Sequence, residues 1–204
     1  MTTDIRFETE FEKPLTFKQA ESSLNFHKVF EANGKVFRKE EYNNNLLIKV
    51  IHYLDTSEDD QLILSDLMTC YPDLTWFEMR TTEQIGPYKK EIQRFLLSIG
   101  EYEDFQITLL LNEDGLLIYE REDEIVNDVA QVMIRKYYYD TVSKREEFEF
   151  VYDVNGHLSS MRGTGSPFVA ENDYSIKNSE IEFFFPGFLS EHPYYQHADL
   201  LPID

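Results

Sequence analysis

The stretch of residues 105–162 constrains the fold most, because apolar and polar side chains alternate along it with the period of two that a half-buried β-strand requires. Residues 105–111 predict one strand, turn-forming residues follow at 112–115, and residues 116–120 predict the strand that returns. The apolar face of such a hairpin is expected to pack against a hydrophobic core, and the polar face is expected to face solvent. We therefore predict an antiparallel hairpin at the start of this stretch.

A second hairpin is predicted directly after the first. Its first strand runs over residues 132–139 and turns near residues 140–144. The returning strand divides its side chains between two faces, with Phe148, Phe150 and Tyr152 on one and Glu147, Glu149 and Asp153 on the other. Asn155 and Gly156 then suit a two-residue turn, because both accept positive φ, and residues 157–161 predict one more strand. The whole stretch predicts an antiparallel meander.

The first half of the chain predicts further strands. Residues 24–30 and 35–41 flank an Asn33-Gly34 turn, which indicates a third hairpin. Residues 46–54 carry apolar side chains on both faces, which is typical of a strand in the middle of a sheet. The sheet is therefore expected to extend through both halves of the sequence.

Two helices are predicted in the first 70 residues. Thr16 and Gln19 occupy the positions of a capping box, which indicates a short helix that ends before Leu24. Residues 57–70 predict a longer helix, with Ser57 as its N-cap, acidic residues in its first turn and an apolar stripe before Pro72. The stripe is formed by Leu62, Ile63, Leu67 and Met68.

A third helix is expected at residues 87–99, after a strand at residues 74–80 that carries the only tryptophan, Trp76. Pro87 lies at the first helical position and Gly100 directly after the last one. The apolar residues between them have helical spacing, at Tyr88, Ile92, Phe95, Leu96 and Ile99.

The two ends of the chain are less regular. The alternation within residues 1–14 suits an edge strand or a loosely held arm. Residues 163–204 predict an aromatic, mostly irregular tail with one strand at residues 180–185. Its aromatic side chains are costly to leave in water, so we expect the tail to pack over the sheet. These side chains are Phe183, Phe184, Phe185, Phe188, Tyr194 and Tyr195.

These elements together predict an α+β fold. We expect residues 1–204 to form a single domain, because this length supports one substantial core. The sheet is expected to be a curved antiparallel meander of eight to ten strands, with helices at residues 57–70 and 87–99 on one face.

The formal charge of −20 limits the kinds of molecule that the chain is expected to bind. Residues 1–102 carry 18 acidic and 12 basic residues, whereas residues 103–204 carry 21 acidic and 7 basic residues, so the second half is the more acidic. Nucleic acid and anionic membrane are not expected as partners, because phosphate binding requires clustered Lys and Arg. No apolar run is long enough for a membrane span, and one cysteine excludes an intrachain disulfide. The expected location is cytoplasmic, or extracytoplasmic if a leader or anchor precedes this chain.

Several residue groups resemble reactive sites, but each has a simpler structural explanation. His192 and His197 with Asp199 nearby do not have the spacing of a standard metal site. Cys70 follows an apolar helical stripe, where a buried structural cysteine is the usual outcome. Glu147 and Glu149 are expected on the solvated face of one strand. We therefore expect no catalytic residues, no metal and no cofactor, and hence a protein that is not an enzyme.

The remaining signal is an acidic sheet surface that carries tyrosines. Tyrosine offers a large contact area at low entropic cost, and carboxylates attract a basic partner during encounter. We predict a protein-binding face at Tyr137, Tyr139, Glu147, Glu149 and Asp153.

In charge, size and aromatic meander, the chain resembles the immunity proteins of bacterial toxin–immunity systems, including the polymorphic toxin systems. This resemblance implies a monomer or weak dimer that occludes the active site of a protein toxin with a basic surface. Some members of this class act outside the cell membrane. The alternative hypothesis is a small-molecule or lipid binder that uses the concave face of the sheet.

Overall fold

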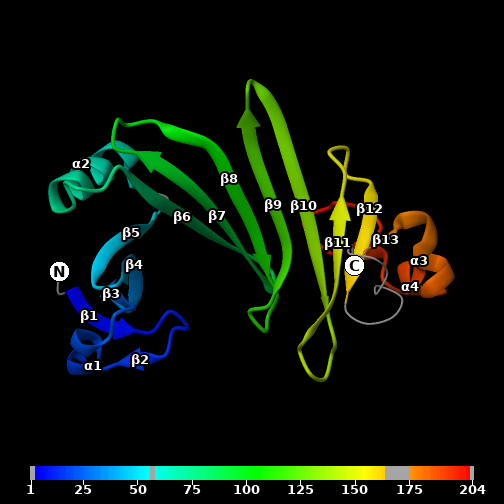
Figure 1. The fold of residues 1–204 in the computed structure, drawn as a ribbon, viewed down its shortest axis with the longest axis horizontal. Coiled ribbons are helices and arrows are strands. Elements are labelled where there is room, and N and C mark those ends of the chain that lie inside the picture. The colour runs from blue at the N-terminus through cyan, green and yellow to red at the C-terminus, as the bar shows by residue number, and fades with distance from the viewer. Residues whose placement is uncertain (1–2, 56–57, 164–174, 203–204) are drawn as a thin grey trace. The chain divides into compact units, whose positions relative to one another are not determined.

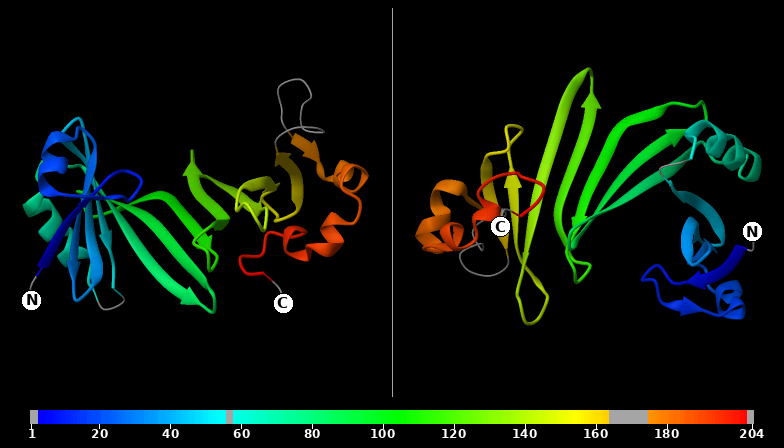
Figure 2. Two further views of the ribbon diagram at one scale, coloured as in Figure 1. Left: turned by 90° about the horizontal axis from the view of Figure 1, so that it is seen from below. Right: turned by 180° about the vertical axis from the view of Figure 1, so that it is seen from behind.

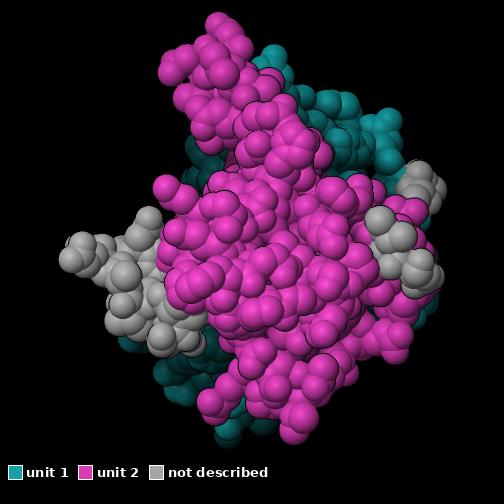
Figure 3. Space-filling model, turned by 90° about the vertical axis from the view of Figure 1, so that its right-hand side faces the viewer, with its two compact units in different colours: residues 1–82, 92–103 teal, residues 83–91, 104–204 magenta. Residues whose placement is uncertain are grey.

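The computed structural model describes residues 3–55, 58–163 and 175–202 (Figure 1). Their contacts divide the chain into two compact units, which Figure 3 distinguishes by colour. Unit 1 comprises residues 1–82 and 92–103, and unit 2 comprises residues 83–91 and 104–204. Each unit is described by itself below, and the expectation of a single domain stays a prediction.

The described strands belong to one large sheet that is rich in antiparallel pairs. In the first half they are β1 (Thr3–Glu8), β2 (Pro14–Leu15), β3 (Phe26–Ala32), β4 (Lys35–Asn43), β5 (Leu46–Tyr53), β6 (Trp76–Ile85) and β7 (Tyr88–Leu97). In the second half they are β8 (Tyr102–Leu111), β9 (Leu117–Val126), β10 (Val129–Tyr139), β11 (Glu146–Tyr152), β12 (Leu158–Gly163) and β13 (Ser175–Lys177). Across the sheet, the strands lie side by side in descending number from β13 to β3, followed by β1 and then by β2.

The α+β meander is confirmed, but its details differ from the expectation. Among the described residues the sheet has thirteen strands, not eight to ten, and β5 pairs with β6 in parallel. At the N-terminal end, β1 pairs with β3 along its whole length, whereas the two-residue β2 pairs with β1 only at Phe7 and Glu8 and is the last strand in the order. The parallel pair arises because the chain passes through helix α2 (Asp60–Cys70) between β5 and β6, and a parallel pair requires such a crossover.

The two helices predicted in the first 70 residues are present. Helix α1 (Phe17–Ser22) starts at the expected capping box of Thr16 and Gln19. Helix α2 starts later than expected, because the Asp59 carboxylate accepts hydrogen bonds from the Gln61 and Leu62 amides and serves as N-cap. Ser57 lies outside the described residues. On α2, Leu64 and Leu67 are buried, whereas Leu62 and Met68 of the predicted stripe are exposed.

The helix predicted at residues 87–99 is wrong, because this segment forms β7. Gly86, with φ of 58°, and Pro87 form the connection from β6 instead of starting a helix. The apolar residues of this segment fit the period of a helix and also that of a strand. An isolated helix of this length is only marginally stable, so pairing with the neighbouring strands of the sheet decides in favour of β7.

Unit 1 has its hydrophobic core between α2 and the sheet. The buried cluster joins Leu64 and Leu67 of α2 to residues of β5, β6 and β7, namely Val50, Phe77, Met79 and Leu96. Residue Ile51, which follows Val50 on β5, lies opposite Glu78 of β6 and points to the other face. That other face carries ion pairs, which are described below.

Unit 2 has its core between the sheet and the C-terminal segment. This segment holds α3 (Asn178–Phe184), α4 (Phe188–Glu191) and a 3-10 helix, η1 (Pro193–Tyr195), which lie along β11 to β13 in Figure 2. Phe150 of β11 is fully buried and stacks on Tyr195 with ring centroids 4.6 Å apart.

The tail is more regular than predicted, since residues 178–184 form α3 and not a strand. Its packing on the sheet is confirmed for Phe185, Phe188 and Tyr195, whereas Phe183 and Phe184 are exposed. Part of the predicted tail, residues 164–174, lies outside the described residues.

Candidate functional site

The candidate site lies on the face of β9, β10 and β11 that points away from the aromatic core of unit 2. Strand register defines this face, because Arg135 lies opposite Glu120 of β9 and Val151 of β11, and Tyr137 lies opposite Glu149. The neighbours of Arg135 on β10, Ile134 and Lys136, are buried and point to the core side. We call Glu120, Glu122, Glu124, Arg135, Tyr137 and Glu149 the acidic face.

Arg135 is the centre of the acidic face. Its Nη1 lies 3.0 Å from Oε2 of Glu120 and 3.1 Å from Oε1 of Glu122, and its Nε lies 3.3 Å from Oε1 of Glu149. The Tyr137 hydroxyl donates a hydrogen bond to Glu120. Three carboxylates are thus held around one guanidinium.

Electrostatics favour the charged form of Arg135 and the neutral form of Tyr137. Burial disfavours the charged form of Arg135 and by itself would lower its pKa. The hydrogen bonds of the guanidinium, of which the one with Glu120 contributes most, outweigh burial and raise the pKa. Burial also raises the pKa of Tyr137, and the hydrogen bond to Glu120 adds to this effect because an anionic phenolate would face a carboxylate. Arg135 is therefore charged and Tyr137 neutral at neutral pH.

The acidic face keeps part of its carboxylates accessible. Glu120, Glu122 and Glu149 each form an ion pair with Arg135, which neutralises them in part. Their side chains retain between 18% and 25% of their exposure, which leaves oxygen atoms accessible to a basic group of a partner. Within the described ranges, no cluster of His, Cys, Asp and Glu is arranged to hold a metal ion.

The structure brings together two of the five residues predicted for the binding face. Tyr137 and Glu149 are cross-strand neighbours in the acidic face. Glu147 is exposed, but it lies at a register shift where Tyr139 pairs with Glu146, so it is displaced from the regular ladder. The Tyr139 hydroxyl instead donates to the Leu117 carbonyl oxygen.

Asp153 is a turn residue in the structure. Its Oδ1 accepts hydrogen bonds from the amides of Asn155 and His157, both at 2.9 Å. These bonds lower the pKa of Asp153, the bond from His157 contributing most. Asp153 therefore stabilises the connection between β11 and β12, as an Asx turn does.

Sequence reasoning missed Glu120, Glu122 and Arg135. The alternation of Glu120, Glu122 and Glu124 along one strand was a usable signal, because same-face carboxylates require a compensating cation. The register that brings Arg135 opposite Glu120 depends on the two-residue loop between β9 and β10, which the sequence analysis did not identify.

The other candidate residues are separated from one another. The His192 ring packs against Phe188 and Tyr138, with centroids 4.6 Å and 5.1 Å away. His197 instead forms an isolated antiparallel β-bridge with His157 through the backbone. Cys70 is exposed at the end of α2, so the expectation of a buried cysteine is wrong. Leu67 is the residue of this last turn that is buried in the core, and the residues after it, up to Cys70, are exposed.

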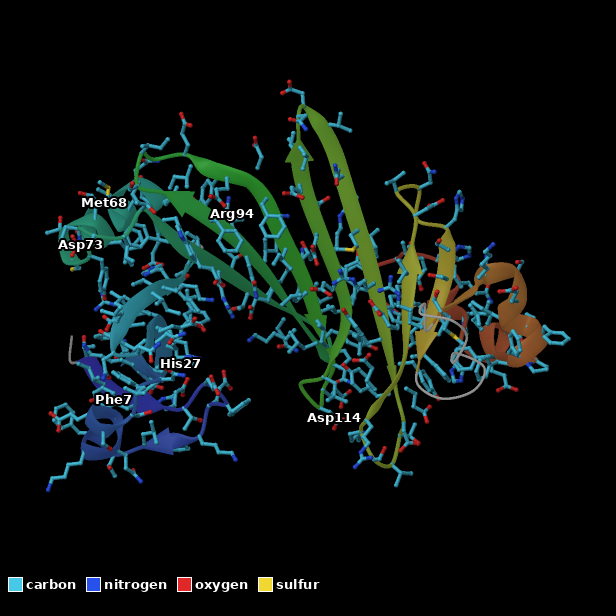
Figure 4. The ribbon with its side chains drawn as sticks, viewed as in Figure 1. Phe7, His27, Met68, Asp73, Arg94 and Asp114 are labelled. Atoms are coloured by element: carbon cyan, nitrogen blue, oxygen red, sulfur yellow. The ribbon has the colours of Figure 1, made fainter. Side chains whose placement is uncertain are left out.

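Unit 1 contains a second group of charged residues, on the face of its sheet opposite α2. Lys39 Nζ lies 2.8 Å from Oε1 of Glu8, and Lys49 Nζ lies 3.1 Å from Oε2 of Glu78. The Nδ1 atom of His27, labelled in Figure 4, is buried without a hydrogen bond among the described residues. These ion pairs connect β1 with β4 and β5 with β6, so the group is an ion-pair network within the sheet of unit 1.

The larger described pockets within single units are lined with charged residues. One of about 480 Å³ in unit 2 is lined in part by Arg121, His157 and Asp199. Another of about 410 Å³ in unit 1 is lined in part by Lys35 and Asp55. The pocket in unit 1 also includes Phe37 and Tyr53 in its lining, so the small-molecule alternative stays a prediction.

Comparisons of the chain with protein-family models, with curated proteins and with solved structures found no match. Among the described helices, none has the length and apolar character needed to cross a membrane.

Proposed function

We propose that the chain is a non-enzymatic protein-binding module, an immunity-type protein that neutralises a toxin by covering its active site with the acidic face. The observation that supports the proposal most is the arrangement of three carboxylates around Arg135 on the sheet face that the C-terminal segment leaves uncovered. An arrangement held by strands needs little reordering on binding, which lowers its entropic cost.

The chemistry of the face indicates a basic partner. The four carboxylates of this face, Glu120, Glu122, Glu124 and Glu149, outnumber its two guanidinium groups, Arg135 and the neighbouring Arg162 that pairs with Glu149. The second half of the chain has a formal charge of −14. Lysines or arginines around a toxin's active site would pair with the accessible carboxylate oxygens, and Tyr137 would supply contact area. Long-range attraction would also accelerate the encounter.

The test uses the protein encoded by the gene next to that of this chain as the candidate toxin. We expect the two purified proteins to form a complex and cells that produce both to survive. Association should slow as salt rises, because screening shortens the reach of the acidic face. If the neighbouring protein is not toxic, or if it is toxic and this chain neither binds it nor protects cells, the proposal is refuted.

Two double variants test whether the toxin binds to the acidic face. Glu122→Gln with Glu149→Gln removes two carboxylates while nearly retaining side-chain shape, and should slow association about tenfold. The matched control is Glu21→Gln with Asp66→Asn, which removes two exposed carboxylates of unit 1. Equal association rates for both double variants would exclude the acidic face as the binding surface.

A further inference from the structure

The end of the β9–β10 hairpin has a free strand edge. β9 pairs with β10 from Val126 opposite Val129 to Tyr119 opposite Lys136. In contrast, β11 pairs with β10 only from Ile134 to Tyr139. Among the described residues, the outer edge of β10 at residues 129–133 therefore has no strand partner, and in Figures 1 and 2 the hairpin extends past β11 and β12. Such an edge is a template for a further strand.

The geometry of the hairpin identifies the free backbone groups. Asn127 and Asp128 form a two-residue loop with φ of 51° and 63°, as a type I′ turn requires. In such a hairpin the residues that flank the loop bond to each other, and bonded pairs then alternate along the ladder. The amide and carbonyl groups of Ala130 and Val132 therefore point outward, away from β9.

The side chains along this edge leave it open. Residues 129–133 contain no charged residue, no proline and no glycine, which are the usual means of blocking an edge. Val129 is 60% exposed and Met133 is 37% exposed. Beside Val132, the pocket of about 480 Å³ leaves space for the side chain of an added strand.

The charges around the edge indicate what pairs with it. Glu124 and Asp128 are exposed and form no ion pair with any described residue. A second copy of this chain would bring the same carboxylates to the edge, where like charges repel. A strand with lysine or arginine side chains would pair with them instead.

We propose that residues 129–133 are a docking edge to which a basic, extended segment of the partner protein adds as a further strand of the sheet. The inference rests on the proposed function and deepens it. The acidic face attracts the partner, and the backbone of Ala130 and Val132 binds a strand of it by main-chain hydrogen bonds.

The probe is a blocked ten-residue peptide of alternating lysine and valine, with a peptide of alternating glutamate and valine as control. Binding is measured by fluorescence anisotropy, and hydrogen exchange of single amides is measured by NMR. We expect the lysine peptide to bind and to slow exchange at Ala130 and Val132, which should be unprotected in the free protein. The glutamate peptide should not bind.

Two variants at one position test the edge itself. Ala130→Pro removes an amide that points outward and leaves the ladder to β9 intact, so it should weaken peptide binding about tenfold. Ala130→Val retains the amide and should bind the peptide as the unchanged protein does. Far-UV circular dichroism of both variants verifies that the sheet is intact.

The outcomes separate this inference from the proposed function. No binding of the lysine peptide, unchanged exchange at Ala130 and Val132, or equal binding by both variants would overturn the docking edge. Dimerisation of the protein through the same amides without peptide would assign the edge to a second copy and also overturn it. The toxin experiment is independent of the peptide, so either proposal can fail while the other stands.

Discussion

Replacing Lys136 by methionine should stabilise unit 2 and change how its stability depends on pH. The Lys136 side chain is fully buried, and its Nζ donates a hydrogen bond of 2.6 Å to the Tyr194 carbonyl oxygen. Nζ also lies 3.5 Å from the centroid of the Tyr194 ring and 5.6 Å from that of Tyr152. Burial lowers the pKa of Lys136 from 10.5 to about 7, and only the charge of Asp199 opposes this shift.

The sign of the effect follows from proton binding. Between pH 7 and 10 the unfolded chain keeps the proton of Lys136 and the folded chain releases it, so the free energy of unfolding should rise with pH. The slope is about 1.4 kcal/mol per pH unit, and the full shift corresponds to about 5 kcal/mol. Above pH 10 the rise should end, because burial raises the pKa of Tyr152 and Tyr194 and unfolding then releases their protons.

Urea unfolding of the unchanged protein and of Lys136→Met from pH 6 to 10 measures this effect. At pH 6 the variant should be more stable by about 2–4 kcal/mol, which is the cost of the buried charge less the hydrogen bond lost at Tyr194. The slope between pH 7 and 10 should disappear. Lys18→Met, at an exposed position on α1, is the control and should retain the slope. A slope that persists in Lys136→Met would refute the assigned environment of Lys136.

Two further substitutions test the cores of the two units by urea unfolding. Phe150→Ala should cost about 3–5 kcal/mol, because Phe150 is fully buried and stacks on Phe188 and Tyr195, and a loss below about 1 kcal/mol would contradict this packing. Tyr71→Phe should cost about 1–3 kcal/mol, because the Tyr71 hydroxyl donates to the buried carboxylate of Glu40, and unchanged stability would exclude a role for this bond.

Local signals sufficed where one pattern admitted one structure. The alternation of residues 146–152 fits only a strand with one aromatic face, and β11 has that face buried. Thr16 and Gln19 cap the start of α1 by reciprocal hydrogen bonds between side chain and backbone within one turn, so this helix start needs no distant partner. These elements were predictable because the interactions that decide them lie close together in the sequence.

The same reasoning predicted part of the candidate site. The face that carries Tyr137 and Glu149 follows from strand alternation, since cross-strand neighbours share a face. Glu147 is exposed as expected, but a register shift on β11 moves it out of the regular ladder. A bulge depends on the pairing of two strands, and the sequence of one strand does not reveal it.

Tertiary structure alone decided the remainder. Residues 88–97 have apolar spacing that suits either a helix or a strand, and the neighbouring strands select the strand by pairing with its backbone. The register of β9 with β10 brings Arg135 between Glu120 and Glu122, and the shorter pairing of β11 exposes the edge at residues 129–133. The physical reason is that backbone pairing is non-local, so the sequence determined which faces are apolar and the pairing determined which charged residues meet.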